Sequence, residues 1–271
     1  MVERLVANEK VEGSTPFARS INYSYLLMNI EKIFDDLKFK VNPSDDYRSS
    51  YKFRFIKSLY KVFRKERDYI FDNCIINKEK IDLDLRKELI KIESMSTYAI
   101  GYLINRICKN LSKNQVYLNI GCWKGFSLVA GMINTQCKVI GIDNFSQFNG
   151  PKNEFLRNFK NSKKNNHFFF EQDYENFFES LDDTKERFDF YFYDGEHSYD
   201  NQLKNLEIAE KFLNVGSLVL IDDINFEEVY EGTLDFIHKS NSKFKIVKEI
   251  KTANNHCHPS FWNGIMILKK V

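Results

Sequence analysis

The sequence predicts an α/β protein: a Rossmann-like, doubly wound sheet of seven strands, mostly parallel with one antiparallel strand, preceded by an N-terminal helical region. Two observations support this fold class. After Lys113, short β-rich runs alternate with helical stretches, which is typical of βαβ units. The last two β-rich runs are joined without a helix, so one of them must run antiparallel at or near an edge.

The N-terminal part, residues 21–112, is expected to be helical. Apolar side chains at Ile56, Leu59 and Phe63 recur at helical spacing, and the stretch "STYAIGYLINRICKNL" repeats the pattern. Residues 1–20 lack any such periodicity, and we expect them to be disordered.

The strands of the second part, residues 113–271, are expected over 115–121, 137–143, 167–173, 187–194, 217–223, 243–250 and 261–268. A polar side chain lies at or near the carboxyl end of each of the first five strands: Asn119, Asp143, Asp173, Asp194 and the pair Asp222-Asp223. Ligands bind at this edge of such sheets. Carboxylates gathered at one edge repel one another, so folding alone gives no reason for them. We therefore expect a ligand site there.

Composition excludes several classes of protein. Apolar residues make up 43% and charged residues 29% of the chain, which is a globular composition. The net charge of +2 gives no strong field, so no nucleic acid partner is expected. There is no apolar run of the ~20 residues that a membrane span needs, and no signal peptide. The five cysteines form no CxxC pair, which indicates free thiols and a cytoplasmic location.

The turn "NIGCWKGFS" joins the first strand to the first helix of the alternating part. Gly121 permits a sharp turn, and Gly125 lets the helix pack close to the strand. Trp123 occupies the position where a dinucleotide-binding turn has a glycine that admits the pyrophosphate. Asp143 follows about 20 residues later, where ribose hydroxyls are bound. A ligand with a ribose and no pyrophosphate fits this pattern, and S-adenosylmethionine is such a ligand.

The stretch "YDGEHSYD" places a carboxylate, a glycine and an imidazole together after a buried strand. The ends of neighbouring strands lie roughly 5 Å apart, which brings Asp194 close to Asp222 and Asp223. Three close carboxylates are costly without a cation, and hard oxygen ligands favour Mg²⁺ or a similar ion. Gly195 bends the chain so that His197 turns back, where it can take a proton from a hydroxyl.

Residues 115–268 resemble the class I S-adenosylmethionine-dependent methyltransferases, and among them the metal-dependent branch typified by macrolide-sugar O-methyltransferases. The matching elements are "NIGCWKGFS", "GIDNF", "YDGEHSYD", "VLIDD" and "WNG". The resemblance implies three groups of site residues: cofactor-binding Asn119, Gly121, Gly125, Ser127, Asp143 and Asp173; metal-binding Asp194, Asp222 and Asp223; and His197 as base. Asn119 departs from the family, which has Glu or Asp there, and so gives up a charge attraction to the ammonium of the cofactor.

The leading functional hypothesis is an O-methyltransferase that acts on a hydroxyl of a sugar or glycan-like small molecule. The alternatives are methylation of an amine, a catechol-like diol or a nucleic-acid base, and a non-catalytic binding module that retains the fold. No Asn-Pro-Pro-aromatic motif follows the fourth strand, which argues against methylation of exocyclic base amines. By the resemblance, the helical region covers the substrate pocket or makes a dimer contact, so a homo-oligomer is one expectation.

Simpler interpretations exist for single residues. His197 could cap the helix near Tyr199, and Asp222-Asp223 could form only a turn before the next helix. His256 and His258 make a poor metal set and are taken as loop residues near the substrate.

The stretch from Arg48 to Arg67 holds eight Lys or Arg and one acid, interleaved with Tyr and Phe. It could contact anionic lipid as a peripheral membrane surface, an acidic glycan or RNA. In the interpretation we favour, its apolar stripe covers the sheet domain while the basic side chains stay in water.

Overall fold

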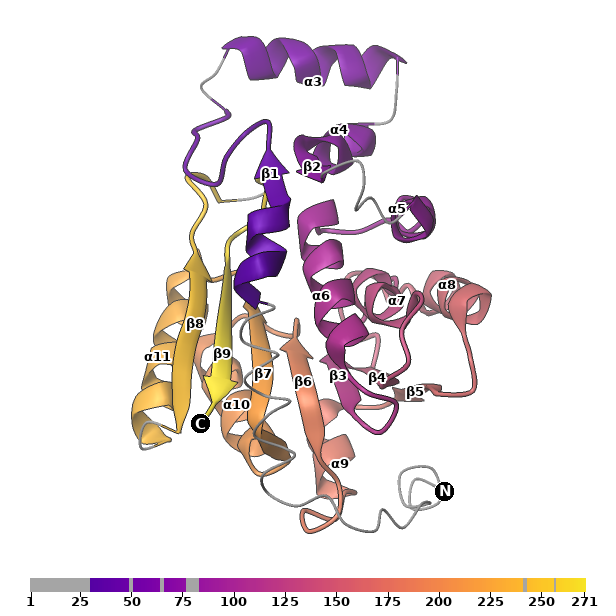
Figure 1. The fold of residues 1–271 in the computed structure, drawn as a ribbon, viewed down its shortest axis with the longest axis vertical. Coiled ribbons are helices and arrows are strands. Elements are labelled where there is room, and N and C mark those ends of the chain that lie inside the picture. Colours follow the sequence, from indigo (N-terminus) through magenta and orange to yellow (C-terminus); the bar gives the residue numbers. More distant parts are fainter. Residues whose placement is uncertain (1–29, 49–50, 64–65, 77–82, 241–242, 256) are drawn as a thin grey trace.

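The computed structural model of the chain describes residues 30–48, 51–63, 66–76, 83–240, 243–255 and 257–271. The predicted disordered segment 1–20 lies outside these residues. Figure 1 shows a sheet with helices on both faces and the elements of residues 37–39, 51–63 and 66–76 stacked beyond one end of it.

The sheet confirms the predicted fold class. Its seven strands lie in the order β5-β4-β3-β6-β7-β9-β8. All pairs are parallel except those of β9, which is antiparallel to both β7 and β8. The strands are β3 (Val116–Ile120), β4 (Lys138–Asp143), β5 (His167–Glu171), β6 (Phe188–Tyr193), β7 (Leu213–Asp222), β8 (Phe244–Ile250) and β9 (Ile265–Lys270).

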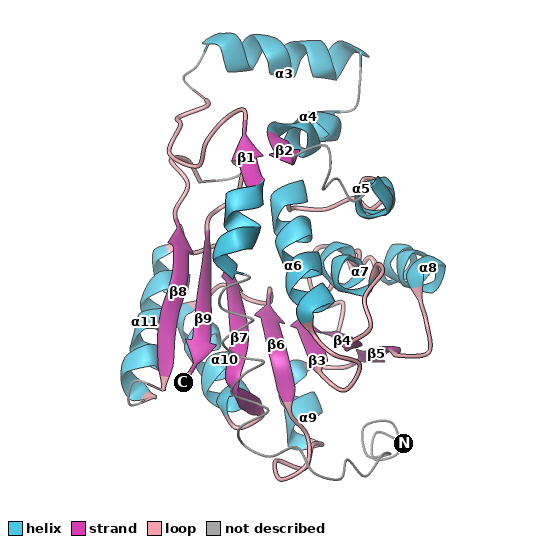
Figure 2. Ribbon diagram, viewed as in Figure 1, coloured by secondary structure: helices cyan, strands magenta, loops and turns pink. Residues whose placement is uncertain are grey.

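Five helices connect the strands and cover the two faces of the sheet (Figure 2): α7 (Phe126–Met132), α8 (Lys152–Ser162), α9 (Tyr174–Glu179), α10 (Tyr199–Glu210) and α11 (Glu227–Lys239). Each face carries its own apolar core. Phe190 and Phe192 of β6 belong to one core, and Tyr191 and Tyr193 belong to the other. Because successive side chains of a strand point to opposite faces, this aromatic strand is buried along its whole length.

The strand order reverses between β3 and β6, which are hydrogen-bonded neighbours in the middle of the sheet. Here β3 leads to α7 on one side, and β6 leads to α10 on the other. Parallel sheets open a crevice at such a switch point, so the carboxyl ends of β3 and β6 define where a ligand site should lie.

The N-terminal region is less uniformly helical than predicted. Residues 30–36 are helical, followed by β1 (Leu37–Phe39), α3 (Tyr51–Phe63), α4 (Glu66–Asn73), β2 (Cys74–Ile76), α5 (Leu83–Leu89) and α6 (Tyr98–Asn110). The strands β1 and β2 form a separate antiparallel pair. Three-residue strands are too short to show a period in sequence, which is why the pair was not predicted.

The edge strand β8 is irregular. Its pairing with β9 shifts register between Ile246 and Lys248. Within the described residues, no helix is both long enough and apolar enough to cross a membrane.

Candidate active site

The glycine turn after β3 is held against the end of β6. The backbone N–H of Asp194 donates to the carbonyl of Ile120 at 2.9 Å. Gly121 has a φ of 78°, and a Cβ added there would lie 2.0 Å from the carbonyl oxygen of Asp194. The predicted need for glycine is therefore steric as well as conformational, since only glycine lets the two strand ends approach this closely.

Asp143, at the end of β4, fixes the shape of the same turn. One carboxylate oxygen, Oδ2, accepts the backbone N–H groups of Cys122 and Trp123, each at 2.7 Å. The other, Oδ1, accepts the N–H of Phe145 at 2.6 Å. A carboxylate oxygen has two lone-pair sites, so Oδ1 retains room for one further donor. Asp143 thus holds the backbone and still has one oxygen able to accept a ligand hydroxyl.

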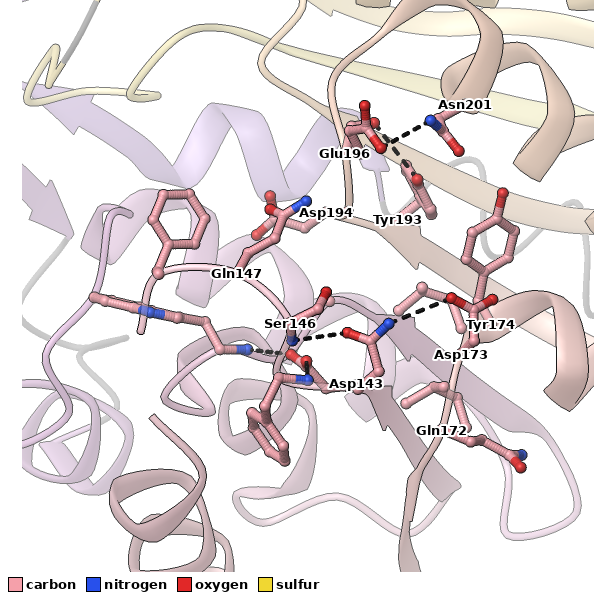
Figure 3. Close-up of a pocket in the computed structure, with 18 of the residues that line it drawn as sticks. Asp143, Ser146, Gln147, Gln172, Asp173, Tyr174, Tyr193, Asp194, Glu196 and Asn201 are labelled. Atoms are coloured by element: carbon pink, nitrogen blue, oxygen red, sulfur yellow. Dashed lines mark hydrogen bonds between the residues drawn. The ribbon is translucent and has the colours of Figure 1, made fainter. Parts of the chain in front are cut away.

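A pocket opens at the carboxyl ends of β3, β4 and β6 (Figure 3). It brings together four of the predicted site residues: Gly121, Asp143, Asp173 and Asp194. Aromatic side chains from the loops after β3 and β4 and from the start of α9 also line it, namely Trp123, Phe145, Phe148 and Tyr174. Acidic and aromatic groups in one crevice suit a ligand with hydroxyl or amino donors and a flat ring.

Asp173 begins helix α9 and faces this pocket. Its Oδ1 accepts the backbone N–H of Glu175 at 2.9 Å, which makes it the N-cap of the helix. Its Oδ2 accepts the side-chain amide of Asn144 at 3.3 Å, a contact drawn in Figure 3. The residue therefore combines a structural cap with a place in the pocket wall.

Three predicted cofactor residues are not among those lining the pocket. The Asn119 side chain is fully buried, and its Oδ1 accepts the hydroxyl of Ser127 at 2.8 Å. Its Nδ2 faces the carbonyls of Ile120 and Gly121 at 3.3 and 3.4 Å. Gly125 is the N-cap of α7, with a φ of 96°. In this structure all three support the glycine turn without lining the pocket. Their direct contact with a cofactor stays a prediction.

Three side chains that could hold a metal ion lie together beside the pocket. Asp194, His197 and Asp223 each offer a ligand atom, and these atoms all lie within 4.8 Å of one another. The Nε2 of His197 is 3.2 Å from Oδ2 of Asp223 and 3.7 Å from Oδ1 of Asp194. This group, which we call the Asp-His-Asp cluster, contains His197 where the sequence analysis expected Asp222.

Asp222 lies next to the cluster and is almost fully buried. Its Oδ1 accepts the backbone N–H of Asp223 at 3.0 Å. Burial, together with the charges of Asp223 and Asp194, raises the pKa of Asp222 well above its ordinary value. For His197, burial lowers the pKa, but the neighbouring carboxylates of Asp194 and Asp223 outweigh it and raise the pKa. The site thus concentrates negative charge that a cation would compensate.

Asn263, which the sequence analysis did not single out as a site residue, positions Asp223. Its buried side-chain amide donates to Oδ1 of Asp223 at 2.8 Å, so Oδ2 is the oxygen that faces His197. Asp223 has a φ of 58°, a left-handed conformation that aspartate tolerates better than most residues. The only sequence signal was the motif "WNG", which was noted as part of a hairpin.

Several buried polar atoms of the site make no hydrogen bond within the described residues. They are Nε1 of Trp123, Nε2 of Gln172, Oη of Tyr174 and Nε2 of His197. The first three belong to residues that line the pocket. Buried donors are normally paired, so these atoms are candidates for contacts with a ligand or with water.

His258 has a structural role between the two parts of the chain. It is fully buried, its Nε2 lies 3.1 Å from the carbonyl of Asp45, and its ring packs edge-on against Tyr47. His256 lies outside the described residues. None of the cysteines in the described residues forms a disulfide.

Comparisons with known proteins give the class of this site. A model described as a methyltransferase domain matches residues 118–224, which span β3 to the residues just after β7. The search of curated proteins found no significantly similar sequence.

Several solved structures share the fold at low sequence identity. An O-methyltransferase from Bacillus cereus in complex with SAH aligns with a TM-score of 0.53 and 14% identity, over 78% of this chain and 99% of that one. The SAH-bound methyltransferase PaMTH1 of Podospora anserina aligns with a TM-score of 0.51 and 13% identity, over 70% and 89%. The chain spans only 50% of a third match, SMU.776 complexed with SAH, at a TM-score of 0.49 and 12% identity.

The sheet order, the pocket at the switch point and the domain match define a class I methyltransferase fold. Residues 118–224 match a methyltransferase domain, and the fold is shared with methyltransferases solved with SAH bound.

Proposed function

We propose that this enzyme transfers the methyl group of S-adenosylmethionine to a hydroxyl of a sugar or glycan-like small molecule, assisted by a divalent metal ion. The observation that carries the proposal is the position of Asp194, which belongs both to the pocket wall and to the Asp-His-Asp cluster. A methyl donor bound in the pocket and a hydroxyl substrate bound at the cluster would therefore lie on either side of Asp194.

The pocket fits the cofactor chemically. Asp143 has an oxygen with room for a ribose hydroxyl, and Asp173 offers a carboxylate where an amino group could donate. The aromatic side chains of Trp123, Phe145 and Phe148 provide surfaces for a flat base. When bound, S-adenosylmethionine supplies an electrophilic methyl group on a sulfonium.

The cluster fits a hard divalent cation. The carboxylates of Asp194 and Asp223 suit Mg²⁺ or Mn²⁺ better than zinc, which favours sites with thiolates or several imidazoles. Burial is the main cause of the raised pKa of Asp222, and the charges of Asp223 and Asp194 raise it further. When bound, the ion would ease deprotonation of the acceptor hydroxyl and fix its oxygen.

His197 is proposed as the base. Its Nε2 is buried, lacks a hydrogen bond within the described residues, and faces the two carboxylates of the cluster. In the reaction the carbon–sulfur bond of the sulfonium breaks, a carbon–oxygen bond to the acceptor forms, and the hydroxyl proton passes to His197. The products are a methyl ether, S-adenosylhomocysteine and a protonated imidazole.

A methyl-transfer assay against a panel of sugars and polyols, with labelled cofactor, tests the proposal. We expect turnover that chelator abolishes and Mg²⁺ or Mn²⁺ restores. Unchanged turnover in chelator would refute the metal part, and methylation of amines in preference to hydroxyls would refute the acceptor class.

The two roles open to His197 can be separated. As a base, His197→Ala should slow turnover by about 10² to 10⁴-fold and leave Mn²⁺ affinity nearly intact. As a metal ligand, the same variant should lose Mn²⁺ affinity in a titration followed by electron paramagnetic resonance. His238→Ala, at an exposed histidine of α11, serves as the matched control.

A further inference from the structure

Helix α3 exposes a continuous apolar stripe. Tyr51, Phe55, Leu59 and Val62 recur every three or four residues and therefore share one face of the helix. Their side chains are 79, 57, 41 and 73% exposed. The expectation that the apolar residues of this stretch cover the sheet domain does not hold for these four.

The same helix is strongly basic. Its 13 residues include Lys52, Arg54, Lys57 and Lys61 and no carboxylate. Arg54 and Lys57 are exposed. An apolar stripe bordered by cations is the pattern of helices that lie in the interface of an anionic bilayer.

The position of α3 suits a flat surface. The helix lies across the end of the molecule, beyond β1 and α4, at the end toward which the arrows of β6 and β8 point (Figure 1). Thirteen residues span about 20 Å, long enough to lie along a membrane surface and too short to cross it.

We propose that the apolar stripe of α3 docks the enzyme on an anionic lipid bilayer, with Tyr51, Phe55, Leu59 and Val62 inserted among the lipid headgroups and Arg54, which flanks the stripe, paired with an anionic lipid. Charge argues against a second copy of the chain on this stripe, because two such helices face to face would bring together twice four cations without a carboxylate in either helix. Docking in this way turns the carboxyl edge of the sheet toward the bilayer.

Co-sedimentation of the full chain with vesicles tests the proposal. We compare vesicles of phosphatidylcholine alone with vesicles that contain a third of phosphatidylglycerol, and expect binding only to the second. The double variant Phe55→Ser/Val62→Ser should bind at least ~10-fold more weakly. Arg54→Gln should bind about 5-fold more weakly, since each basic residue near the surface contributes about that factor.

Val215→Ser/Ile246→Ser, which changes two exposed apolar residues away from α3, is the matched control and should bind as the wild type does. Thermal unfolding of each variant checks that the fold is kept. The proposal would be overturned if the wild type did not bind anionic vesicles. It would also be overturned if the charge variant Arg54→Gln lost binding while Phe55→Ser/Val62→Ser kept it, or if Phe55→Ser/Val62→Ser changed the oligomeric state of the lipid-free protein.

Discussion

Substitution of Asn263 by leucine tests whether Asp223 is held in position for a metal ion. Asn263 is 3% exposed, and its amide gives Asp223 a hydrogen bond of 2.8 Å. Leucine keeps the volume of the side chain and removes the donor. The buried oxygen of Asp223 then loses a charge-assisted hydrogen bond, which contributes about 1.5–3 kcal/mol.

Part of this lost free energy lowers the stability of the fold, and part lowers the affinity for the metal ion. Groups that orient a metal ligand typically change metal affinity by about 10 to 100-fold when they are removed. That range corresponds to about 1.4–2.7 kcal/mol of binding free energy, similar to the lost hydrogen bond. We therefore expect Mn²⁺ affinity to fall by at least 10-fold, while affinity for S-adenosylmethionine changes little.

The assay is a Mn²⁺ titration of the purified enzyme, followed by electron paramagnetic resonance, with cofactor affinity measured by calorimetry. Asn105→Leu is the control, because Asn105 is also fully buried and donates to the carbonyls of Ala130 and Ile133, in helix α7 and at its C-cap. Equal Mn²⁺ affinity in wild type and Asn263→Leu would refute the reasoning. So would an equal loss in Asn105→Leu.

Three further predictions concern the turn and the sheet. Gly121→Ala should lower the free energy of unfolding by at least about 2 kcal/mol, because its Cβ would lie 2.0 Å from a carbonyl oxygen at positive φ; Gly216→Ala, at a φ of 86°, controls for the backbone strain in the same denaturation measurement. Asp143→Asn should weaken cofactor binding by ~10-fold or more in calorimetry, since an amide cannot accept at both positions; unchanged affinity would contradict it. His167 has a pKa lowered to about 4, chiefly by burial, so protonation favours the unfolded state and stability falls as the pH drops from about 6.5 toward 4. At pH 5 the loss should be about 2 kcal/mol in urea unfolding, and His167→Gln should remove it.

The sheet and the location of the site were predictable because both depend on local patterns. The β-rich runs set the strands, and strand ends in a parallel sheet meet at one edge, so Asp143, Asp173 and Asp194 could be assigned to one crevice in advance. The single antiparallel strand followed from the missing helix between 250 and 265.

The details of the site depend on contacts that local patterns do not encode. Asp143 was predicted to bind ribose, but nothing in its sequence neighbourhood shows that three backbone N–H groups occupy most of its acceptor capacity. Asn263 lies 40 residues from Asp223, and only the folded hairpin brings its amide there. His258 likewise contacts Asp45 across 213 residues, which changes its interpretation from a loop residue near substrate to a buried structural one.

The irregular pairing of β8 has a consequence for how copies of this enzyme can meet. A regular outer strand would present unused backbone donors and acceptors to any extended segment of another molecule. Here the register shift interrupts that row, and exposed charges at Lys245, Lys248 and Glu249 lie on both sides of it. Pairing of two molecules through the edge strand β8 is therefore disfavoured. The enzyme should resist forming fibrous aggregates through this strand even when it is concentrated.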